Sequence, residues 1–548
     1  MKKALHLFFS LMASKKNSPY LPIYFAIILI IGVYIGTKIV SVSALQNNLF
    51  SLSADNYDKL NDVVNYIESD YVDSIDREKI TNEAIDEILS NLDPHSNYIS
   101  AEEFIEINSN LTGNFEGIGV QFRIEKDTIK VIHPIQGGPS KKVGIKAGDR
   151  IVIIDSVNVG GIGISNSDAM KKLKGKRGTK VNVSIFRRGI PELLDFAITR
   201  DVIPTYSLDI AYMVNDSIGY IKLNKFSATT YQEFDDALKN LLDKGLKKLI
   251  LDLRGNVGGY LQAAIQLADE FLKNQELIVY TEGNNRPTAF AYATSKGIFE
   301  DKELIILIDD QSASASEIVA GAIQDNDRAL IIGRRSFGKG LVQEQLNLPD
   351  GSAVRLTVAR YYTPTGRCIQ KSYENGNEDY YYESYQRYLN GEMLSVDSVH
   401  FNDSLKFTTP KGKIVYGGGG IMPDIFVPIP SEPDLKFYKQ VVDKGSIFQF
   451  VFEYSDKYRH KLDQYQNFED YNNRFEINNN EFQEFIEYAD SKGVKCNKAL
   501  INKSKDRILL MLKALIGREI FDNEGFYPIY HKTDSTFLKA LNILSGLD

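Results

Sequence analysis

The stretch "ELIILIDDQSASASEIVAG", residues 303–321, decides the fold of this chain. Its first part is an unbroken apolar run from Leu304 to Ile308, which predicts a strand buried on both faces of a sheet. Its second part, "SEIVAG", predicts the start of a helix. Ser312, Ser314 and Ser316 stand at alternate positions between the two parts. A serine at a helix start meets free backbone N–H groups and the positive end of the helix dipole, which suits a nucleophile.

Similar apolar runs lie on either side of this stretch. "SIGYIKL" (217–223), "KKLILDL" (247–253) and "ALIIG" (329–333) predict strands, and they alternate with helical patterns at 230–245 and from Tyr260 onward. This alternation predicts an α/β core with a parallel or mixed sheet covered on both faces. In such sheets the ligand site lies at the carboxyl ends of the strands, where the serines and the turn "RGNVGG" also fall.

A serine nucleophile needs a base, and histidine is absent between His133 and His400, where the sheet lies. Lys339, in "SFGKGLVQEQ" after the strand 329–333, is the alternative, because a dry site lowers the pKa of a lysine. Gln343, four residues later, lies on the same side in helix or strand geometry and can orient the amine. The turn at Gly258–Gly259 can supply an oxyanion donor.

Each of these features has an ordinary alternative. A serine at a helix start is usually an N-cap, a lysine between glycines is usually a solvated turn residue, and "RGNVGG" is also an ordinary tight turn. "GRRSFGKG" (333–340) resembles a phosphate-binding loop, but Gly340 stands where Ser or Thr must hold Mg²⁺. The following residues, 341–364, predict a hairpin instead of the required helix, so we reject the nucleotide reading.

The composition excludes several function classes. The net charge of −8 disfavours a nucleic-acid partner, and the six histidines are scattered, so no metal site is expected. Acyl transfer by a serine and a lysine requires no cofactor. Cys368 and Cys496 match no metal-ligand spacing and form no disulfide framework.

The N-terminus predicts a membrane anchor. Residues 1–19 carry four lysines and no acidic residue, and residues 20–42 predict a single transmembrane helix that places the rest of the chain outside the cytoplasm. A signal peptide cleaved after Ala44 is the alternative. A helical module is expected over 50–110, and short strands with Gly-rich turns predict a small, partly open β-barrel over 113–201.

The remaining boundaries follow from composition. The core covers 202–430 and contains a polar, Tyr-rich insertion at about 372–410, which we expect to be exposed. A helix-leaning extension covers 431–548, and its role does not follow from the sequence.

Taken together, the motifs resemble the carboxyl-terminal processing peptidases, a family of tail-specific serine peptidases with a PDZ domain. The resemblance runs from about 55 to 430 and keeps the order of the family motifs. They are "YVDSIDREKITNEAIDEILSNLDPHSNYIS", "EGIGVQF", "GPSKKVGIKAGDRIVIIDSVNV", "LDLRGNVGG", "SASASE", "GRRSFGKGLVQ", "YYTPTGRCIQ" and "GGGIMPDI". Val257 stands where the family usually has proline. The resemblance implies a crotonase-like α/β protease core with an inserted PDZ barrel.

The resemblance also implies the roles of individual residues. Ser314 falls on the nucleophile, Lys339 on the dyad lysine and Gln343 on its glutamine. Ala315, Gly258 and Gly259 fall on the oxyanion donors, and Asp325 on a supporting acid. The loop Gly117, Ile118, Gly119 and Val120 is expected to bind the free carboxylate of an apolar C-terminal tail.

The expected partners are therefore the C-terminal tails of extracytoplasmic proteins, on the periplasmic side if the cell is Gram-negative. A homo-oligomer or an adaptor protein stays open as a further partner. The alternative function is a catalytically silent PDZ-containing scaffold of the same fold. Intact Ser314, Lys339 and Gln343 argue against it.

Overall fold

A computed structural model describes residues 23, 26–32, 58–135, 137–430, 435–495 and 497–547. The chain divides into two units, Met1–Ile85 and Asp86–Asp548. The predicted span at 20–42 lies largely outside the described residues, as do residues 1–19. Among the residues that are described, we find no helix with the length and apolarity needed to cross a membrane.

The first unit contains helix α4 (Lys59–Asp70) and most of helix α5 (Arg77–Ser90). Asp58 caps α4 by accepting a hydrogen bond from the Asn61 N–H. The Arg77 guanidinium donates to Asn65 Oδ1 at 2.8 Å and so ties the two helices together. The predicted helical module is therefore helical here, as expected.

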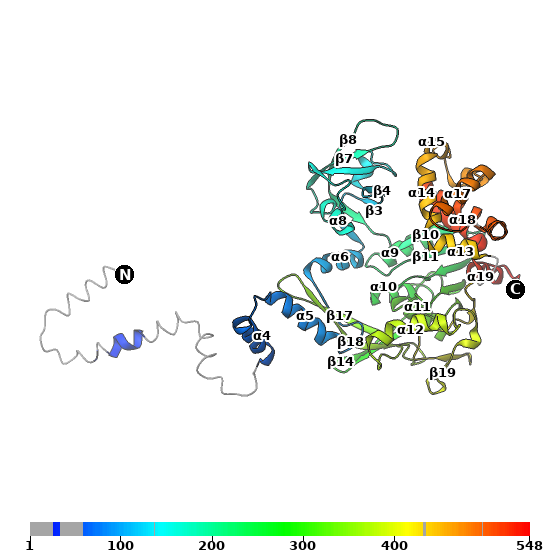
Figure 1. The fold of residues 1–548 in the computed structure, drawn as a ribbon. Coiled ribbons are helices and arrows are strands. Elements are labelled where there is room, and N and C mark those ends of the chain that lie inside the picture. The colour runs from blue at the N-terminus through cyan, green and yellow to red at the C-terminus, as the bar shows by residue number, and fades with distance from the viewer. Residues whose placement is uncertain are drawn as a thin grey trace. The chain divides into compact units, whose positions relative to one another are not determined.

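The core of the second unit is a mixed sheet in the order β10-β11-β12-β15-β16-β21, in which β10 alone runs antiparallel to its neighbour (Figure 1). Its strands are β10 (Leu208–Met213), β11 (Ile218–Leu223), β12 (Lys248–Asp252), β15 (Glu303–Ile308), β16 (Leu330–Gly333) and β21 (Ile425–Phe426). Side chains alternate between its faces, so Leu249 and Leu251 pack on one side and Ile250 on the other.

Helices cover both faces, which confirms the predicted buried sheet. One face packs against α9 (Thr230–Asp243), α10 (Leu261–Asp269) and α11 (Ala315–Asp325) through residues such as Phe234, Leu267 and Val319. The other face packs against α19 (Ser535–Ser545) through Phe537 and Leu544. The continuous apolar runs of the sequence result from this double burial.

A second, antiparallel sheet lies beside the loops that carry Ser314 and Lys339. It contains β1 (Asn97–Ile99), β13 (Leu277–Gly283), β14 (Arg286–Tyr292), β17 (Leu341–Asn347) and β18 (Ala353–Tyr362). Strands β17 and β18 form the predicted hairpin, which rules out a phosphate loop followed by a helix. Strand β1, which was expected to be part of a helical module, pairs with β18 instead. Helix α6 (Ala101–Thr112) follows it, capped by Ser100 and Glu103 in a capping box.

A small barrel lies between Val120 and Thr199, within the stretch 113–201 for which the sequence predicts one. Its elements are β3 (Val120–Ile124), β4 (Ile129–Pro134), α7 (Pro139–Lys142), β5 (Arg150–Ile154), β6 (Val157–Asn158), α8 (Asn166–Leu173), β7 (Lys180–Phe186) and β8 (Leu194–Thr199). They enclose a core of their own that includes Val131, Ile151 and Val183. An antiparallel ribbon of β2 (Asn114–Gly117) and β9 (Asp201–Pro204) leads the chain into and out of this barrel.

The insertion at 372–410 is only partly exposed, contrary to expectation. It forms α12 (Asn377–Leu389), η2 (Val396–Ser398), η3 (Asp403–Leu405) and β19 (Lys406–Thr408). Strand β19 pairs with β20 (Ile414–Tyr416), which follows the insertion. Tyr381, Tyr382 and Tyr385 are exposed, but Tyr380 and Arg387 are buried. Arg387 donates to the carbonyl oxygen of Ser336 at 2.7 Å, so α12 packs on the loop that carries Lys339.

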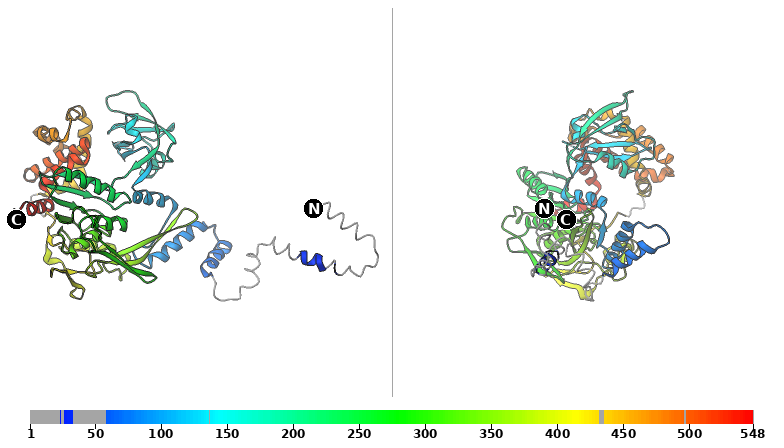
Figure 2. Two further views of the ribbon diagram at one scale, coloured as in Figure 1. Left: turned by 180° about the vertical axis from the view of Figure 1, so that it is seen from behind. Right: turned by 90° about the vertical axis from the view of Figure 1, so that its left-hand side faces the viewer.

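The extension beyond 431 is helical, as predicted. Figures 1 and 2 show most of its helices, orange to red, gathered in one body, whereas the last helix lies against the core sheet. They are α13 (Lys436–Asp443), α14 (Ser446–Lys457), α15 (Arg459–Leu462), α16 (Phe468–Arg474), α17 (Asn479–Ser491), α18 (Lys498–Tyr530), η5 (His531–Thr533) and α19. Phe450, Phe485 and Leu512 belong to its own apolar core, so we call residues 435–547 the C-terminal domain.

Candidate active site

The carboxyl end of β15 presents the three serines in different ways. Ser312 and Ser316 are fully buried, and their hydroxyls donate to the carbonyl oxygens of Leu253 (2.8 Å) and Asn256 (2.9 Å). These bonds fasten the serine turn to the end of the neighbouring strand β12. Ser314 instead lines a cavity, so it is the serine whose side chain is available to a substrate.

Ser314 has a strained backbone. It precedes α11 with a φ of 54°, a left-handed conformation that residues with a side chain rarely adopt. Such strain persists only where the surroundings enforce it, and it is concentrated at functional sites. Here the Ser314 N–H donates to Glu317 Oε2 at 2.8 Å, while the Ser314 carbonyl oxygen accepts from the Glu317 and Ile318 N–H groups.

The Glu317 carboxylate joins the serine turn to the lysine loop. Oε2 accepts from the N–H groups of Ser314 and Lys339 (2.8 and 2.9 Å), and Oε1 accepts from the Gly338 N–H at 2.7 Å and from the Ser336 hydroxyl. Burial raises the pKa of Glu317 to about 7, and its four donors oppose that shift. One carboxylate therefore fixes the backbones of both Ser314 and Lys339.

Tyr361, on β18, makes a second link between these two residues. Its buried hydroxyl lies 2.7 Å from the Lys339 carbonyl oxygen and 3.2 Å from that of Ser314. Glu317 of helix α11 and Tyr361 of strand β18 thus fix the relative position of the two loops. Sequence reasoning identified neither link, although Glu317 stands three residues after Ser314, which is the spacing of a capping box.

The structure brings the side chains of Lys339 and Gln343 together. Lys339 Nζ donates to Gln343 Oε1 at 2.8 Å. Burial of Lys339 and, to a smaller extent, the nearby Arg355 guanidinium lower its pKa to about 8. A substantial share of this amine is therefore neutral near pH 8, as a general base must be.

Gln343 is held in turn by residues that the sequence did not single out. Its Nε2 donates to the carbonyl oxygen of His95, and His95 Nε2 lies 2.8 Å from the Tyr380 hydroxyl. Gln370 Oε1 accepts from the Gly340 N–H, and its Nε2 lies 3.5 Å from the same hydroxyl. Tyr380 of α12 thus supports the lysine loop from two directions.

Two backbone N–H groups near Ser314 have no hydrogen-bond acceptor within the described part of the chain. Among the described residues, the N–H groups of Ala315 and Gly259 donate no hydrogen bond, whereas the Gly258 N–H is used by Asn256 Oδ1 at 2.9 Å. A Cβ on Gly258 would come within 2.8 Å of Ser314 Cβ and 2.9 Å of the Ala315 nitrogen. Glycine at 258 is therefore required for the two turns to approach each other.

A cavity of about 670 Å³ opens onto these groups. Val257, Gly259, Ile318, Leu341, Arg355 and others line it together with Ser314, Lys339 and Gln343. Asn108 and Leu111 of α6 also contribute to its wall. Leu341, Val342 and Gln343 of strand β17 border the cavity.

Asp325 lies at the other end of α11 and has a structural environment. It forms an ion pair with Arg367 at 2.7 Å, and both side chains are fully buried. It also accepts from the Thr365 N–H (3.1 Å) and hydroxyl (2.7 Å). Asp325 therefore anchors the loop after β18, in keeping with the supporting role expected from the sequence.

The predicted carboxylate-binding loop borders a second cavity, of about 230 Å³, in the small barrel. Ile118, Gly119 and Val120 line it on one side and Leu173 of α8 on another. In the described part of the chain, the Ile118 and Gly119 N–H groups donate no hydrogen bond, while their carbonyl oxygens accept from Ser140 and Ile135. Gly117, the last residue of β2, lies at the start of this loop.

The titratable residues of the described segments include no group of three or more arranged to hold a metal ion.

Models of known families match the core and the small barrel separately. Residues 217–377 match the model of peptidase family S41, and residues 117–198 match the PDZ domain. Residues 437–522, in the C-terminal domain, match a family of unknown function, DUF8443.

The alignments with individual relatives cover most of the length of those relatives. The carboxy-terminal-processing protease of Bartonella bacilliformis is 37% identical over 350 residues, which are 63% of this chain and 80% of that protein. The carboxy-terminal processing protease CtpA of Bacillus subtilis is 36% identical over 330 residues, 60% of this chain and 70% of that protein. A solved structure, the photosystem II D1 C-terminal processing protease, is 26% identical, covers 68% of this chain and 88% of its own, and has a TM-score of 0.35.

From these matches we conclude that the chain belongs to peptidase family S41 and is a PDZ-containing serine peptidase of the carboxy-terminal processing kind.

Proposed function

We propose that this peptidase cleaves proteins near free, apolar C-terminal tails through a dyad of Ser314 and Lys339, with Gln343 orienting the lysine. One observation carries the proposal: a single carboxylate, that of Glu317, accepts from the backbone N–H groups of Ser314 and Lys339 at the wall of one cavity. The pKa of Lys339, lowered to about 8, supports its role as the base.

The reaction is acyl transfer to water. Neutral Lys339 takes the hydroxyl proton of Ser314 as the Ser314 oxygen attacks the scissile carbonyl carbon. The Ala315 and Gly259 N–H groups donate to the oxyanion, with Gly258 leaving the space for them. The ammonium of Lys339 gives its proton to the leaving amine of the substrate. The Lys339 amine, neutral again, then activates the water that hydrolyses the ester.

Recognition is assigned to the PDZ domain. The free N–H groups of Ile118 and Gly119 bind the terminal carboxylate, and β3 pairs with the extended tail, beginning at Val120. The last side chain enters the cavity beside Leu173, which favours an apolar residue. The N-terminal 20–42 segment anchors the chain in a membrane, with the peptidase on the extracytoplasmic side.

The test uses the full chain in detergent and a reporter protein with a disordered, apolar tail, followed by intact mass. Wild type is expected to cut the reporter with a free carboxylate and to leave an amidated reporter almost uncut. Ser314→Ala is expected to abolish cleavage while binding of the tail persists. Equal cleavage of the two reporters refutes the recognition scheme, and cleavage by Ser314→Ala refutes the nucleophile. Wild type that binds the tail without cutting it favours the scaffold alternative.

A further inference from the structure

The C-terminal domain is joined to the catalytic core by an apolar contact. Phe537 and Leu544 of α19 share one buried cluster with Tyr220 and Ile250 of the sheet, and the His531 ring stacks on Phe537 at 3.9 Å. Buried apolar contact of this kind offers no charges for salt to screen and does not open without loss of stability.

A buried ionic cluster fixes the same joint. The Arg254 guanidinium, which directly precedes the "GNVGG" turn, lies between Asp252 (2.6 Å) and Asp534 (2.8 Å). Removing one partner of such a cluster leaves a buried charge uncompensated. The C-terminal domain is therefore a rigid part of the catalytic core.

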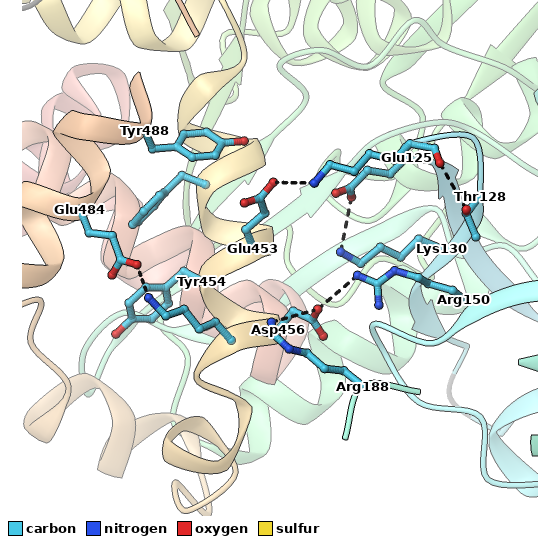
Figure 3. Close-up of a pocket in the computed structure, with 13 residues that line it drawn as sticks. Glu125, Thr128, Lys130, Arg150, Arg188, Glu453, Tyr454, Asp456, Glu484 and Tyr488 are labelled. Atoms are coloured by element: carbon cyan, nitrogen blue, oxygen red, sulfur yellow. Dashed lines mark hydrogen bonds and ion pairs between the residues drawn. The ribbon is translucent and has the colours of Figure 1, made fainter. Parts of the chain in front are cut away.

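The same domain touches the PDZ domain through contacts of a different kind. The Phe452 ring of α14 receives Lys130 Nζ at 3.5 Å and the Arg123 guanidinium at 3.9 Å. Asp456, one turn further along α14, forms an ion pair with Arg150 at 3.3 Å, as Figure 3 shows. Cation–π contacts and ion pairs replace the apolar packing of the first joint.

The charges across this second contact are complementary. Arg188 approaches Asp456 at 3.6 Å, and Lys126 approaches Glu453 at 3.7 Å. In each of these ion pairs the cation belongs to the PDZ domain and the anion to the C-terminal domain. The groups surround a cavity of about 420 Å³, so part of this contact is unfilled. The side chains of Lys130 and Asp456 are buried in it, whereas those of Lys126, Glu453 and Arg188 are exposed. Ion pairs at the exposed rim of a polar contact between domains weaken in salt.

The PDZ domain is otherwise linked to the core by the ribbon of β2 and β9, and α6 runs between its groove and the catalytic cavity. Glu106 and Ser109 of α6 line the PDZ groove, while Asn108 and Leu111 line the catalytic cavity. In the described structure no PDZ residue lines the catalytic cavity, so both sites are open at once.

We propose that the C-terminal domain is a brace, rigidly joined to the core, that holds the PDZ domain through a releasable ionic contact in the position where both sites are open. A tail bound in the groove then passes along α6 into the catalytic cavity. The inference assigns a role to the domain of unknown function, and its effect on cleavage rests on the function proposed above.

The first test measures the contact without using activity. In a full-length background with Cys368→Ser and Cys496→Ser, the pair Lys126→Cys and Glu453→Cys is joined with a short bismaleimide linker. Joining is expected to be fast in 50 mM NaCl and at least fivefold slower in 1 M NaCl. Adding Asp456→Arg is expected to slow it at least fivefold at low salt, whereas Asp463→Arg, at an exposed site of the same domain, leaves it unchanged. Equal rates for the two arginine variants overturn the brace.

The second test reads cleavage of the reporter. Asp456→Arg is expected to lower kcat/KM at least fivefold with little change in the affinity for the tail, and adding Arg150→Asp and Arg188→Asp to it is expected to restore most of the loss. Joining the two thiols is expected to preserve cleavage. A linked enzyme that is inactive, or an Asp456→Arg variant more active than wild type, refutes the proposal that the brace holds the PDZ domain where both sites are open. If wild type does not cleave at all, the proposed function fails. The linking rates still test whether the C-terminal domain holds the PDZ domain through an ionic contact.

Discussion

Glu317→Gln tests the link between the serine turn and the lysine loop. The substitution keeps the size of the side chain but replaces one oxygen with an NH₂ group. Turned one way, this group faces the Ser314 and Lys339 N–H groups; turned the other way, it faces the Gly338 N–H and the Ser336 hydroxyl. In either orientation at least one buried N–H group loses its acceptor.

The size of the effect follows from these bonds. A hydrogen bond to a charged group contributes about 1.5–3 kcal/mol, so losing one or two of them lowers the free energy of unfolding by about 1.5–6 kcal/mol. A shift of about 1 Å in a catalytic group lowers the rate by roughly 100-fold. We therefore expect kcat for Glu317→Gln to fall by about 100-fold or more in the protein that stays folded.

The assay measures kcat on the tailed reporter together with the melting temperature. Glu270→Gln is the matched control, because Glu270 is equally buried and accepts from the Tyr231 hydroxyl at 2.7 Å and the Ile298 N–H at 3.1 Å. This control is expected to lose stability and to keep kcat within about threefold of wild type. Wild-type kcat in Glu317→Gln would refute the reasoning, as would an equal fall in both variants.

Three further predictions concern the base, the support of the lysine loop by Tyr380, and the buried ion pair of Asp325. Because the neutral amine of Lys339 is the active form and its pKa lies at about 8, kcat/KM should rise about tenfold from pH 7 to pH 9; a flat profile would exclude this base. Tyr380→Phe removes a buried hydroxyl that supports the lysine loop and should lower kcat while shifting the pH midpoint, whereas Tyr382→Phe at an exposed site should change neither. Arg367→Leu leaves the buried Asp325 carboxylate unpaired and should lower the free energy of unfolding by about 3–5 kcal/mol, measured by urea titration.

The sheet and the small barrel could be predicted because their signals are local. Apolar runs such as 304–308 result from double burial in the sheet, and glycine turns such as 254–259 mark the strand ends. The choice of Ser314 among three serines came from the family resemblance. The structure gives the physical reason, since the hydroxyls of Ser312 and Ser316 are used by neighbouring carbonyl oxygens.

The supports of the site could not be predicted, because they depend on contacts between distant segments. Tyr380 stands among exposed tyrosines in a polar segment, and its burial depends on His95, 285 residues away. Likewise, the helical nature of the 431–548 extension was evident, but its contact with the PDZ domain requires Asp456 and Arg150, 306 residues apart. The hydrophobic periodicity of one segment does not indicate which distant segment it contacts.

The most direct test of the account is to identify the residue that carries the acyl group. Enzyme in excess is mixed with the tailed reporter, quenched in acid within milliseconds to seconds, and mapped by peptide mass. We expect the N-terminal fragment of the reporter to be attached as an ester to Ser314, and this adduct to be absent in Ser314→Ala together with cleavage. An acyl group on another residue, or cleavage that continues in Ser314→Ala, would contradict the account.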